Sequence, residues 1–322
     1  MQSPVLSARF SPFSPHIVAG GTYSGQILIW DDRAKSLPVL KSPMSNNTHT
    51  HPVFQVDIVG TQHAHNIVSV SSDGLVCSWA LDMLNKPLEV VDLNKTANQE
   101  LKEAADDQEK SKKVKALAND FAVTCFDFQP GETKSMVLGT EEGNLYKGSR
   151  HDKATPKEKI QKADAYRGHG GPVTAVHFHP GGNTSVFGNL ILTSSMDWSV
   201  KLWELGKYQK PLRSFDEFGD YVLGAAWSPV HPALFSAVDA EGRLSLWNLN
   251  QDTDLPVKTL TVCQKGLNKV KWNKDGSKTA VASLDGTVYI HDVGDLGTPK
   301  AGDSEKFQKV LDDFRADQVA SQ

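Results

Sequence analysis

The segment that decides the fold begins at Gly168 and ends at Trp203, and it reads GHGGPVTAVHFHPGGNTSVFGNLILTSSMDWSVKLW. After the initial Gly-His, apolar and polar residues alternate in VTAVHFHP, which begins at Val173. A second apolar stretch, LILTSSM, is followed directly by Asp197, and a third stretch ends in Trp203. Alternation with a period of two, rich in β-branched and aromatic residues, is typical of β-strands. The segment therefore predicts three strands joined by turns.

Five other stretches open in the same way. They are VLSARFSP from Val5, VFQVDIVG from Val53, VTCFDFQP from Val123, VLGAAWSP from Val222 and LNKVKWNK from Leu267. In all six stretches the sixth residue is large and apolar: Phe10, Ile58, Phe128, Phe178, Trp227 and Trp272. Self-similarity of this kind indicates a repeat architecture.

Each repeat also contains a turn position and a later aromatic position. The turn position is polar or acidic: Ser24, Asp73, Glu142, Asp197, Glu241 and Asp285. Glycine follows it in five repeats, which suits a turn that requires a positive φ, whereas the fourth repeat has Trp198. Six residues after the turn position stand Trp30, Trp79, Gly148, Trp203, Trp247 and His291.

These repeats resemble WD40 repeats, in which each blade is a four-stranded antiparallel sheet. We therefore expect an all-β WD40 β-propeller with six blades over residues 1–295, interrupted by a charged insert at 94–118. Propellers of this family usually close with an N-terminal outer strand, and nothing before Val5 can supply one. The ring is expected either to close with six blades or to need a further N-terminal segment.

The tail at 296–322 predicts an amphipathic helix from about Ser304. Phe307, Val310, Leu311 and Phe314 recur at the spacing of one helical face. This apolar stripe is expected to pack on the propeller's own rim, and the alternative is that it binds a partner.

The resemblance to WD40 repeats gives some polar residues a structural role. In that family a His, a strand Ser or Thr, the turn Asp and the Trp are linked by hydrogen bonds, because a buried carboxylate is costly unless it is fully bonded. The corresponding residues are His169, Asp197 and Trp203 in the fourth repeat, His49, Asp73 and Trp79 in the second, and Trp30 and Trp247 in two others. Ser194 or Ser195 would supply the hydroxyl of the fourth repeat. Looser packing is expected in the third repeat around Gly148.

Composition excludes several classes of function. The 34 basic and 38 acidic residues give a formal net charge of −4, without the basic excess of a nucleic-acid-binding protein. The longest apolar runs are too short for membrane insertion. The three cysteines have no metal-site or redox-motif spacing, which fits reduced thiols in a cytosolic protein.

Catalytic and cofactor-binding motifs are also missing. The sequence contains no GxSxG, no GxGxxG after a strand, no P-loop and no HExxH, so we expect neither an enzyme nor a cofactor. The histidines His49, His51, His63 and His65 alternate, but no Cys or acid completes a tetrahedral set. No metal site is expected.

Five stretches carry a more specific resemblance. They are GGTYSGQILIWDDR at 20–33, HTHPVFQVDIVGTQHAHNIVSVSSDGLVCSWALDML at 49–84, SSMDWSVKLW at 194–203, WSPVHPALFSAVDAEGRLSLWNLNQDT at 227–253 and LNKVKWNKDG at 267–276. Together they are similar to the C-terminal propeller of the cytoplasmic dynein intermediate chain family. The resemblance implies a non-catalytic, cytoplasmic and microtubule-associated subunit that docks on the dynein heavy chain and supports cargo attachment and transport.

The resemblance also implies that other dynein subunits bind a region outside this chain. The alternative function is a WD40 adaptor that presents substrates in a ubiquitin-ligase or signalling complex. Co-purification with the heavy chain or with ligase components would discriminate the two.

Residues at the turns are candidates for binding the partner. The residue before each turn acid is expected to point from one face of the disc, which places Tyr23, Met196 and Leu284 there, with Trp198 beside them. Aromatic anchors are enriched in binding hot spots. Arg243 follows a turn glycine and could form interface salt bridges. The alternatives are partly buried turn packing for the apolar residues and a solvated charge for Arg243.

Overall fold

A computed structural model describes residues 3–34, 36–45, 47–96, 120–151, 153–155, 158–161, 164–182 and 186–320. From residue 97 onward the charged insert expected at 94–118 lies outside these ranges. The described residues form two compact units, and the strands in each are joined into antiparallel sheets.

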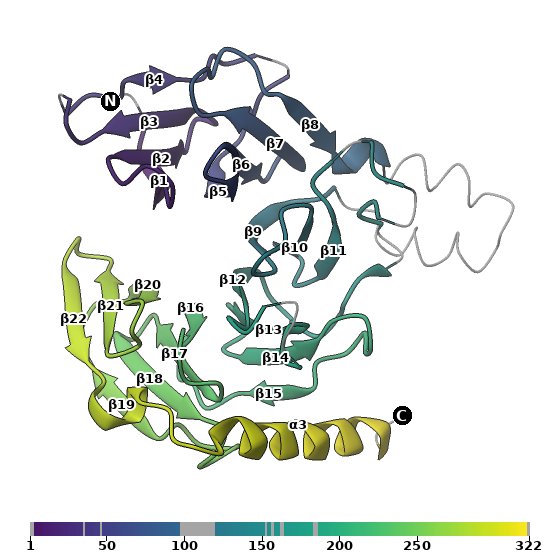
Figure 1. Ribbon diagram of the computed structural model, residues 1–322, viewed down its shortest axis with the longest axis vertical. Coiled ribbons are helices and arrows are strands. Elements are labelled where there is room, and N and C mark those ends of the chain that lie inside the picture. Colours follow the sequence, from purple (N-terminus) through teal and green to yellow (C-terminus); the bar gives the residue numbers. More distant parts are fainter. Residues whose placement is uncertain are drawn as a thin grey trace, which may run out of the picture. The chain divides into compact units, whose positions relative to one another are not determined.

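Unit 1 comprises residues 1–128, 133–141 and 145–165 and contains three sheets (Figure 1). The first sheet contains β1 (Val5–Phe10), β2 (Ile17–Thr22), β3 (Ile27–Asp31) and β4 (Leu40–Lys41). The second contains β5 (Val53–Thr61), β6 (Ala64–Ser71), β7 (Leu75–Ala80) and β8 (Glu89–Asp92). The third contains β9 (Val123–Phe128), β10 (Ser135–Thr140) and β11 (Leu145–Ser149).

Unit 2 comprises residues 129–132, 142–144 and 166–322 and also contains three sheets. The first contains β12 (Val173–Phe178), β13 (Leu190–Ser195), β14 (Val200–Glu204) and β15 (Arg213–Phe215). The second contains β16 (Val222–Trp227), β17 (Leu234–Asp239), β18 (Arg243–Asn248) and β19 (Lys258–Thr261). The third contains β20 (Leu267–Trp272), β21 (Lys278–Ser283) and β22 (Val288–Asp292), and is followed by the 3₁₀ helix η3 (Gly294–Gly297) and by α3 (Asp303–Ala320).

Each sheet is a meander that matches one of the six expected repeats, and they are numbered here as blades 1 to 6 in chain order. The first three strands of every blade follow the predicted pattern. In blade 4, Trp203 pairs with Ile191 across β13 and β14, so the hairpin is symmetrical about Asp197. Blade 2 repeats this register, with Trp79 opposite Ile67. The spacing of turn acid and Trp in the sequence therefore sets the register of the hairpin.

The large apolar residue at the sixth position of the first strand is buried in most blades. Ile58, Phe178 and Trp227 are 5%, 3% and 1% exposed. Phe10 of β1 is 65% exposed. A large apolar residue at the sixth position is therefore not buried by its own blade alone. Its burial requires a neighbouring sheet that covers it.

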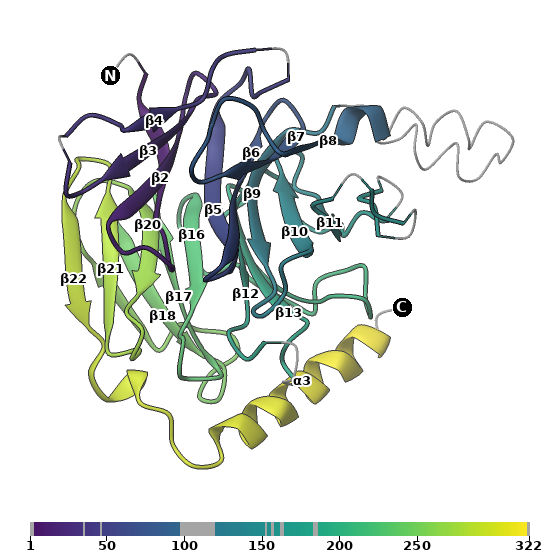
Figure 2. The same ribbon diagram turned by 45° about the horizontal axis from the view of Figure 1, so that its top comes forward.

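The predicted C-terminal helix is present as α3 and packs on unit 2 (Figure 2). Phe307, Leu311 and Phe314 are buried in the same apolar cluster as Trp227 and Phe215, which come from the strands. The expectation that the stripe packs on the protein itself is therefore correct, and the alternative of a partner-binding stripe is wrong.

Blade 3 differs from the sequence-based expectation. The charged stretch 151–166 contributes buried side chains to this blade, since Ile160 is only 3% and Ala165 only 6% exposed. The Ser149 amide donates to the Glu158 carbonyl, which holds this stretch beside β11. The backbone nitrogen of Ile160 lies 2.8 Å from where a Cβ of Gly148 would be, so Ile160 occupies the space of the missing tryptophan. The expectation of loose packing at this position is therefore wrong.

Candidate functional site

A continuous hydrogen-bond network crosses blade 4. The Trp203 indole Nε1 donates to Thr193 Oγ1 at 2.8 Å, and His169 Nε2 lies 2.7 Å from the same hydroxyl. The other ring nitrogen, His169 Nδ1, lies 2.9 Å from Asp197 Oδ2. Thr193 and Trp203 are fully buried. The network therefore joins the second strand, the third strand, the turn and the loop before the first strand.

The chemistry of the end groups fixes the direction of each hydrogen bond. An indole N–H can only donate and an ionised carboxylate can only accept. Thr193 therefore accepts from Trp203 and donates to His169 Nε2, while His169 donates through Nδ1 to Asp197. Burial lowers the pKa of His169, although Asp197 opposes this effect, and the neutral ring is the form that satisfies both neighbours.

The Asp197 carboxylate accepts several hydrogen bonds within blade 4. Its oxygens accept from the Gly170 amide at 2.9 Å and from Ser199 Oγ at 2.6 Å, in addition to His169. Burial raises the pKa of this carboxyl, but the hydrogen bonds from His169, Ser199 and Gly170 outweigh burial and hold the pKa below its ordinary value. The hydrogen bonds of the Asp197 carboxylate therefore stabilise the turn, and the carboxylate is too weakly basic to act as a general base.

Blade 2 contains the same network in unit 1. The Trp79 indole donates to Ser69 Oγ at 2.9 Å, and His49 Nε2 lies 2.7 Å from that hydroxyl. His49 Nδ1 lies 3.3 Å from both oxygens of Asp73, and the Thr50 amide donates to Asp73 at 3.1 Å. The longer distances make the histidine–carboxylate link weaker than in blade 4.

The hydroxyl of blade 4 comes from Thr193, so the expectation of Ser194 or Ser195 is wrong. Ser194 Oγ bonds to Thr174, and Ser195 Oγ donates to the Gly171 carbonyl. The side chains of a strand alternate between its faces, and the face that carries Ile191 opposite Trp203 carries Thr193 next. The sequence contained this signal, because the hydroxyl stands four residues before the turn acid in both blades.

The same position explains why Trp30 and Trp247 are not in such networks. Four residues before the turn position lie Gly20 in blade 1 and Ala237 in blade 5, neither of which has a hydroxyl. The Nε1 of Trp247 has no hydrogen-bond partner among the described residues, and its ring stacks on Phe235 with centroids 5.8 Å apart. Trp30 lies over Gly20, where a Cβ would be only 2.7 Å from its ring. Both tryptophans therefore contribute by packing.

The candidate binding residues of unit 2 lie on one surface, which we call the turn face. It consists of the turns between second and third strands and the loops before the first strands: residues 168–172, 196–199, 216–221, 240–243, 262–266 and 284–287. These segments meet because the start of each first strand pairs with the end of the second strand in all three blades. Blades 4 and 5 are aligned by the hydrogen bond that Thr174 donates to the Val222 carbonyl.

Trp198 is the most unusual residue of the turn face. Its φ is 65°, in the left-handed region, and among the described residues other than glycine it is the only one with a positive φ. Its side chain is 49% exposed. Met196 and Leu284, the other predicted apolar residues of this face, are 39% and 63% exposed. All three are therefore accessible to a partner.

The two remaining candidates are in different situations. Tyr23 belongs to unit 1 and is 61% exposed, with its amide bonded to the Pro4 carbonyl. The guanidinium of Arg243 lies 2.8 Å from Asp239 and 2.7 Å from Glu241, so its charge is satisfied within blade 5. Tyr221, which the repeat pattern did not single out, is 47% exposed on the turn face, and its carbonyl accepts from the Ala240 amide.

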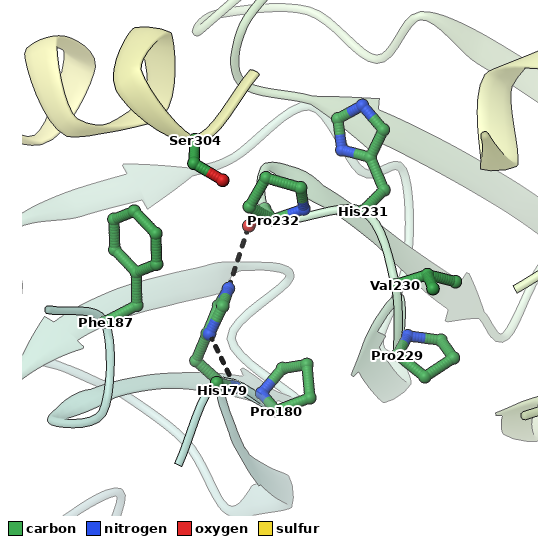
Figure 3. Close-up of a pocket in the computed structure, with 9 residues that line it drawn as sticks. His179, Pro180, Phe187, Pro229, Val230, His231, Pro232 and Ser304 are labelled. Atoms are coloured by element: carbon green, nitrogen blue, oxygen red, sulfur yellow. Dashed lines mark hydrogen bonds between the residues drawn. The ribbon is translucent and has the colours of Figure 1, made fainter. Parts of the chain in front are cut away.

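A pocket of about 230 Å³ lies beside the start of α3, away from the turn face (Figure 3). His179 Nε2 donates to the Pro232 carbonyl at 2.9 Å, and its Nδ1 accepts from the Gly181 amide at 3.1 Å. Both nitrogens of this ring are therefore occupied, and burial lowers its pKa. Phe187, whose ring centroid lies 5.2 Å from that of His179, and Ser304 also line the pocket. The pocket is also lined by His231, whose Nδ1 accepts from the Ala233 amide at 3.2 Å and whose Nε2 lies 3.4 Å from Asp303.

Among the described residues there is neither a metal-binding cluster nor a helix suited to span a membrane. They contain no cluster of three or more His, Cys, Asp or Glu side chains arranged to hold a metal ion. They also contain no helix with the length and hydrophobicity needed to span a membrane.

Comparison with known proteins identifies the family. The family described as "WD domain, G-beta repeat" matches residues 2–31, 160–204 and 255–292. The chain is 41% identical over 320 residues, 98% of its length, to a Drosophila melanogaster protein named "Cytoplasmic dynein 1 intermediate chain". The chain is a homologue of this dynein intermediate chain.

The similarity to this dynein intermediate chain covers only part of the relative. The chain spans about 44% of the length of that curated relative. The matched WD repeats and the six meander sheets confirm the predicted fold class, an all-β WD40 propeller with six blades and a C-terminal helix over the described residues. The similarity does not favour the alternative function as a ubiquitin-ligase or signalling adaptor.

Proposed function

We propose that this chain is a non-catalytic subunit of a cytoplasmic dynein complex, and that the turn face of unit 2 docks on the tail of the dynein heavy chain. The similarity to a dynein intermediate chain supports the first part. On this proposal the chain works in the cytoplasm on microtubules, and other dynein subunits bind outside it. The hydrogen-bond networks around Thr193 and Ser69 hold the blades together and take no part in chemistry.

The observation that carries the docking proposal is the conformation of Trp198. A non-glycine residue in the left-handed region costs about 1–2 kcal/mol. Five of the six blades use glycine at this position, so the turn does not require a tryptophan. Because the ring is half exposed, its burial within the chain returns little of the cost. Strain of this kind persists at binding sites, where a partner compensates it.

The neighbours of Trp198 extend this surface. Met196 is exposed on the same turn of blade 4, Tyr221 is exposed on the loop before the first strand of blade 5, and Leu284 is exposed on blade 6. Leu284 packs on the loop before the first strand of its own blade, since its Cδ1 lies 2.9 Å from where a Cβ of Gly266 would be, and the Ala240 carbonyl of blade 5 lies 3.0 Å from the same point. Large, rigid, partly exposed side chains of this type form hot spots when a partner covers them. Tyr23 is a separate candidate contact on unit 1.

The substitution Trp198→Gly tests the docking proposal. Glycine is the residue of the other blades and relieves the strained φ, so the variant should be as stable as the wild type or about 1 kcal/mol more stable. Loss of a hot-spot side chain should weaken heavy-chain binding by about 2 kcal/mol, roughly thirtyfold. The measurement is the equilibrium affinity of the full chain for a purified heavy-chain tail.

The matched control is Val319→Ala on α3. The Val319 side chain is 63% exposed but lies away from the turn face. The Val319→Ala variant should therefore bind the heavy-chain tail with the affinity of the wild type. Unchanged affinity in Trp198→Gly would reject the turn face as the docking surface.

A further inference from the structure

The turn face of unit 2 is strongly acidic. Its six segments contain six carboxylates: Asp197, Asp216, Glu217, Asp220, Glu241 and Asp285. They contain only two cations, Arg243 and Lys265. The formal charge of this face is therefore −4, equal to the formal net charge of the entire chain. The rest of the protein is balanced, and its negative charge is concentrated where the apolar candidates lie.

The acids and the apolar residues belong to one continuous surface. Phe215 pairs with Val200 across β14 and β15, so the loop 216–221 begins next to the turn that carries Trp198. The same loop meets blade 5, because a Cβ on Gly219 would lie 2.6 Å from the Arg243 guanidinium and 3.3 Å from Glu241. The loop therefore links the acids of blade 4 to those of blade 5.

Most of these carboxylates are not neutralised by the chain's own cations. Arg243 is already shared between Asp239 and Glu241. Asp220 accepts from the Tyr221 amide, which is a neutral donor. Asp216 accepts from Ser214 Oγ, and this hydroxyl accepts from the Lys201 ammonium at 2.7 Å, so Asp216 has one cation nearby. Hydrogen bonds from Thr287 lower the pKa of Asp285, so that it remains ionised. Asp216, Glu217 and Asp285 are exposed to solvent.

We infer that the heavy-chain segment that docks here is basic, with Lys or Arg side chains next to its apolar anchors. This inference rests on the docking function proposed above. A basic segment would pair its cations with the acidic loop 216–221, and the faces of Trp198 and Tyr221 would accept a guanidinium or ammonium by cation–π contact. Its apolar side chains would cover Met196 and Leu284. Complementary charge of this kind mainly accelerates association.

The test uses two nearly isosteric changes, Glu217→Gln and Asp220→Asn, made together in the full chain. The amide oxygen of Asn can keep the hydrogen bond from the Tyr221 amide, so the loop should retain its structure. The control is Asp313→Asn with Asp317→Asn, which removes the same charge from the exposed side of α3. Association rates with the purified heavy-chain tail are measured from low to high salt.

At low salt the Glu217→Gln, Asp220→Asn variant should associate about tenfold more slowly than the wild type, and its rate should depend less on salt. The Asp313→Asn, Asp317→Asn control should behave as the wild type. Equal effects in both pairs, or no effect in either, would overturn the inference. Self-association of the chain that depends on Glu217 and Asp220 would also overturn it, since a second copy would then be the occupant.

The failure of this inference can be distinguished from that of the docking proposal. If Trp198→Gly abolishes binding while the charge variants associate normally, the turn face is the docking surface but its partner segment is not basic. If the heavy-chain tail does not bind the wild-type chain at all, both the proposal and the inference fall.

Discussion

Thr193 is the residue on which the cohesion of blade 4 depends most directly. Its hydroxyl accepts from Trp203 and donates to His169, so one oxygen atom satisfies two buried groups. The substitution Thr193→Val keeps the shape of the side chain and removes only this hydroxyl. The substitution Thr193→Ser keeps the hydroxyl and removes a methyl group. The pair therefore separates hydrogen bonding from packing at one position.

The structure sets the size of the two effects. Thr193 and Trp203 are both fully buried, so water cannot replace the lost partner in Thr193→Val. A buried polar group left without its partner costs about 1–3 kcal/mol, and two are affected, which gives about 3 kcal/mol in total. In Thr193→Ser the loss of one buried methyl costs about 1 kcal/mol. The opening equilibrium of blade 4 should therefore rise about a hundredfold in the Val variant and about fivefold in the Ser variant.

Hydrogen exchange of peptides from residues 190–203 measures this opening directly. A local measurement is preferable to a single melting temperature, because the chain consists of two compact units. The peptides of blade 2, which lie in unit 1, should exchange at the wild-type rate in both variants. Equal protection of blade 4 in Thr193→Val and Thr193→Ser would refute this role for the hydroxyl.

Three further predictions concern burial, the helix and pH. Phe178→Ala should lower the free energy of unfolding, measured by urea titration, by about 3–5 kcal/mol. Phe10→Ala, at the equivalent but exposed position, should lower it by less than about 1 kcal/mol. Equal losses in the two variants would contradict this account of burial. Arg315 donates two hydrogen bonds to Glu204 at 2.9 and 2.8 Å, so Arg315→Ala should destabilise the docked helix by about 1–2 kcal/mol, and Glu204→Gln in addition should recover part of the loss in a double-mutant cycle. Burial lowers the pKa of His179 in the folded chain, so the unfolded chain binds a proton at this residue more readily. The free energy of unfolding should therefore be at its full value above about pH 6.5 and fall as the pH drops below it. If a His179→Gln variant shows the same pH dependence, His179 is not the origin of the effect.

The turn chemistry could be predicted from the sequence because it is local. The Asp–Gly turn and the Trp six residues later fix a symmetrical hairpin, so the spacing alone is enough to place Asp73 and Trp79 correctly. The hydroxyl of Thr193 follows from the same register, since it stands four residues before Asp197. The prediction of Ser194 or Ser195 failed because it considered the residue type and not the face of the strand on which each side chain lies.

What the sequence by itself determined is the repeated meander, the turn positions, the apolar stripe of α3 and the family. Each of these depends on residues close together in the chain, whose spacing directly encodes strand alternation, turn geometry or helical periodicity. Only the tertiary structure decided that Ile160 fills the space beside Gly148, and that Phe178 is buried while Phe10 is exposed. It also decided that the loop 216–221 begins beside the turn of blade 4 and approaches Arg243 and Glu241 of blade 5. Burial and electrostatic environment depend on which segments distant in the chain lie against one another, and spacing within one repeat does not contain that information.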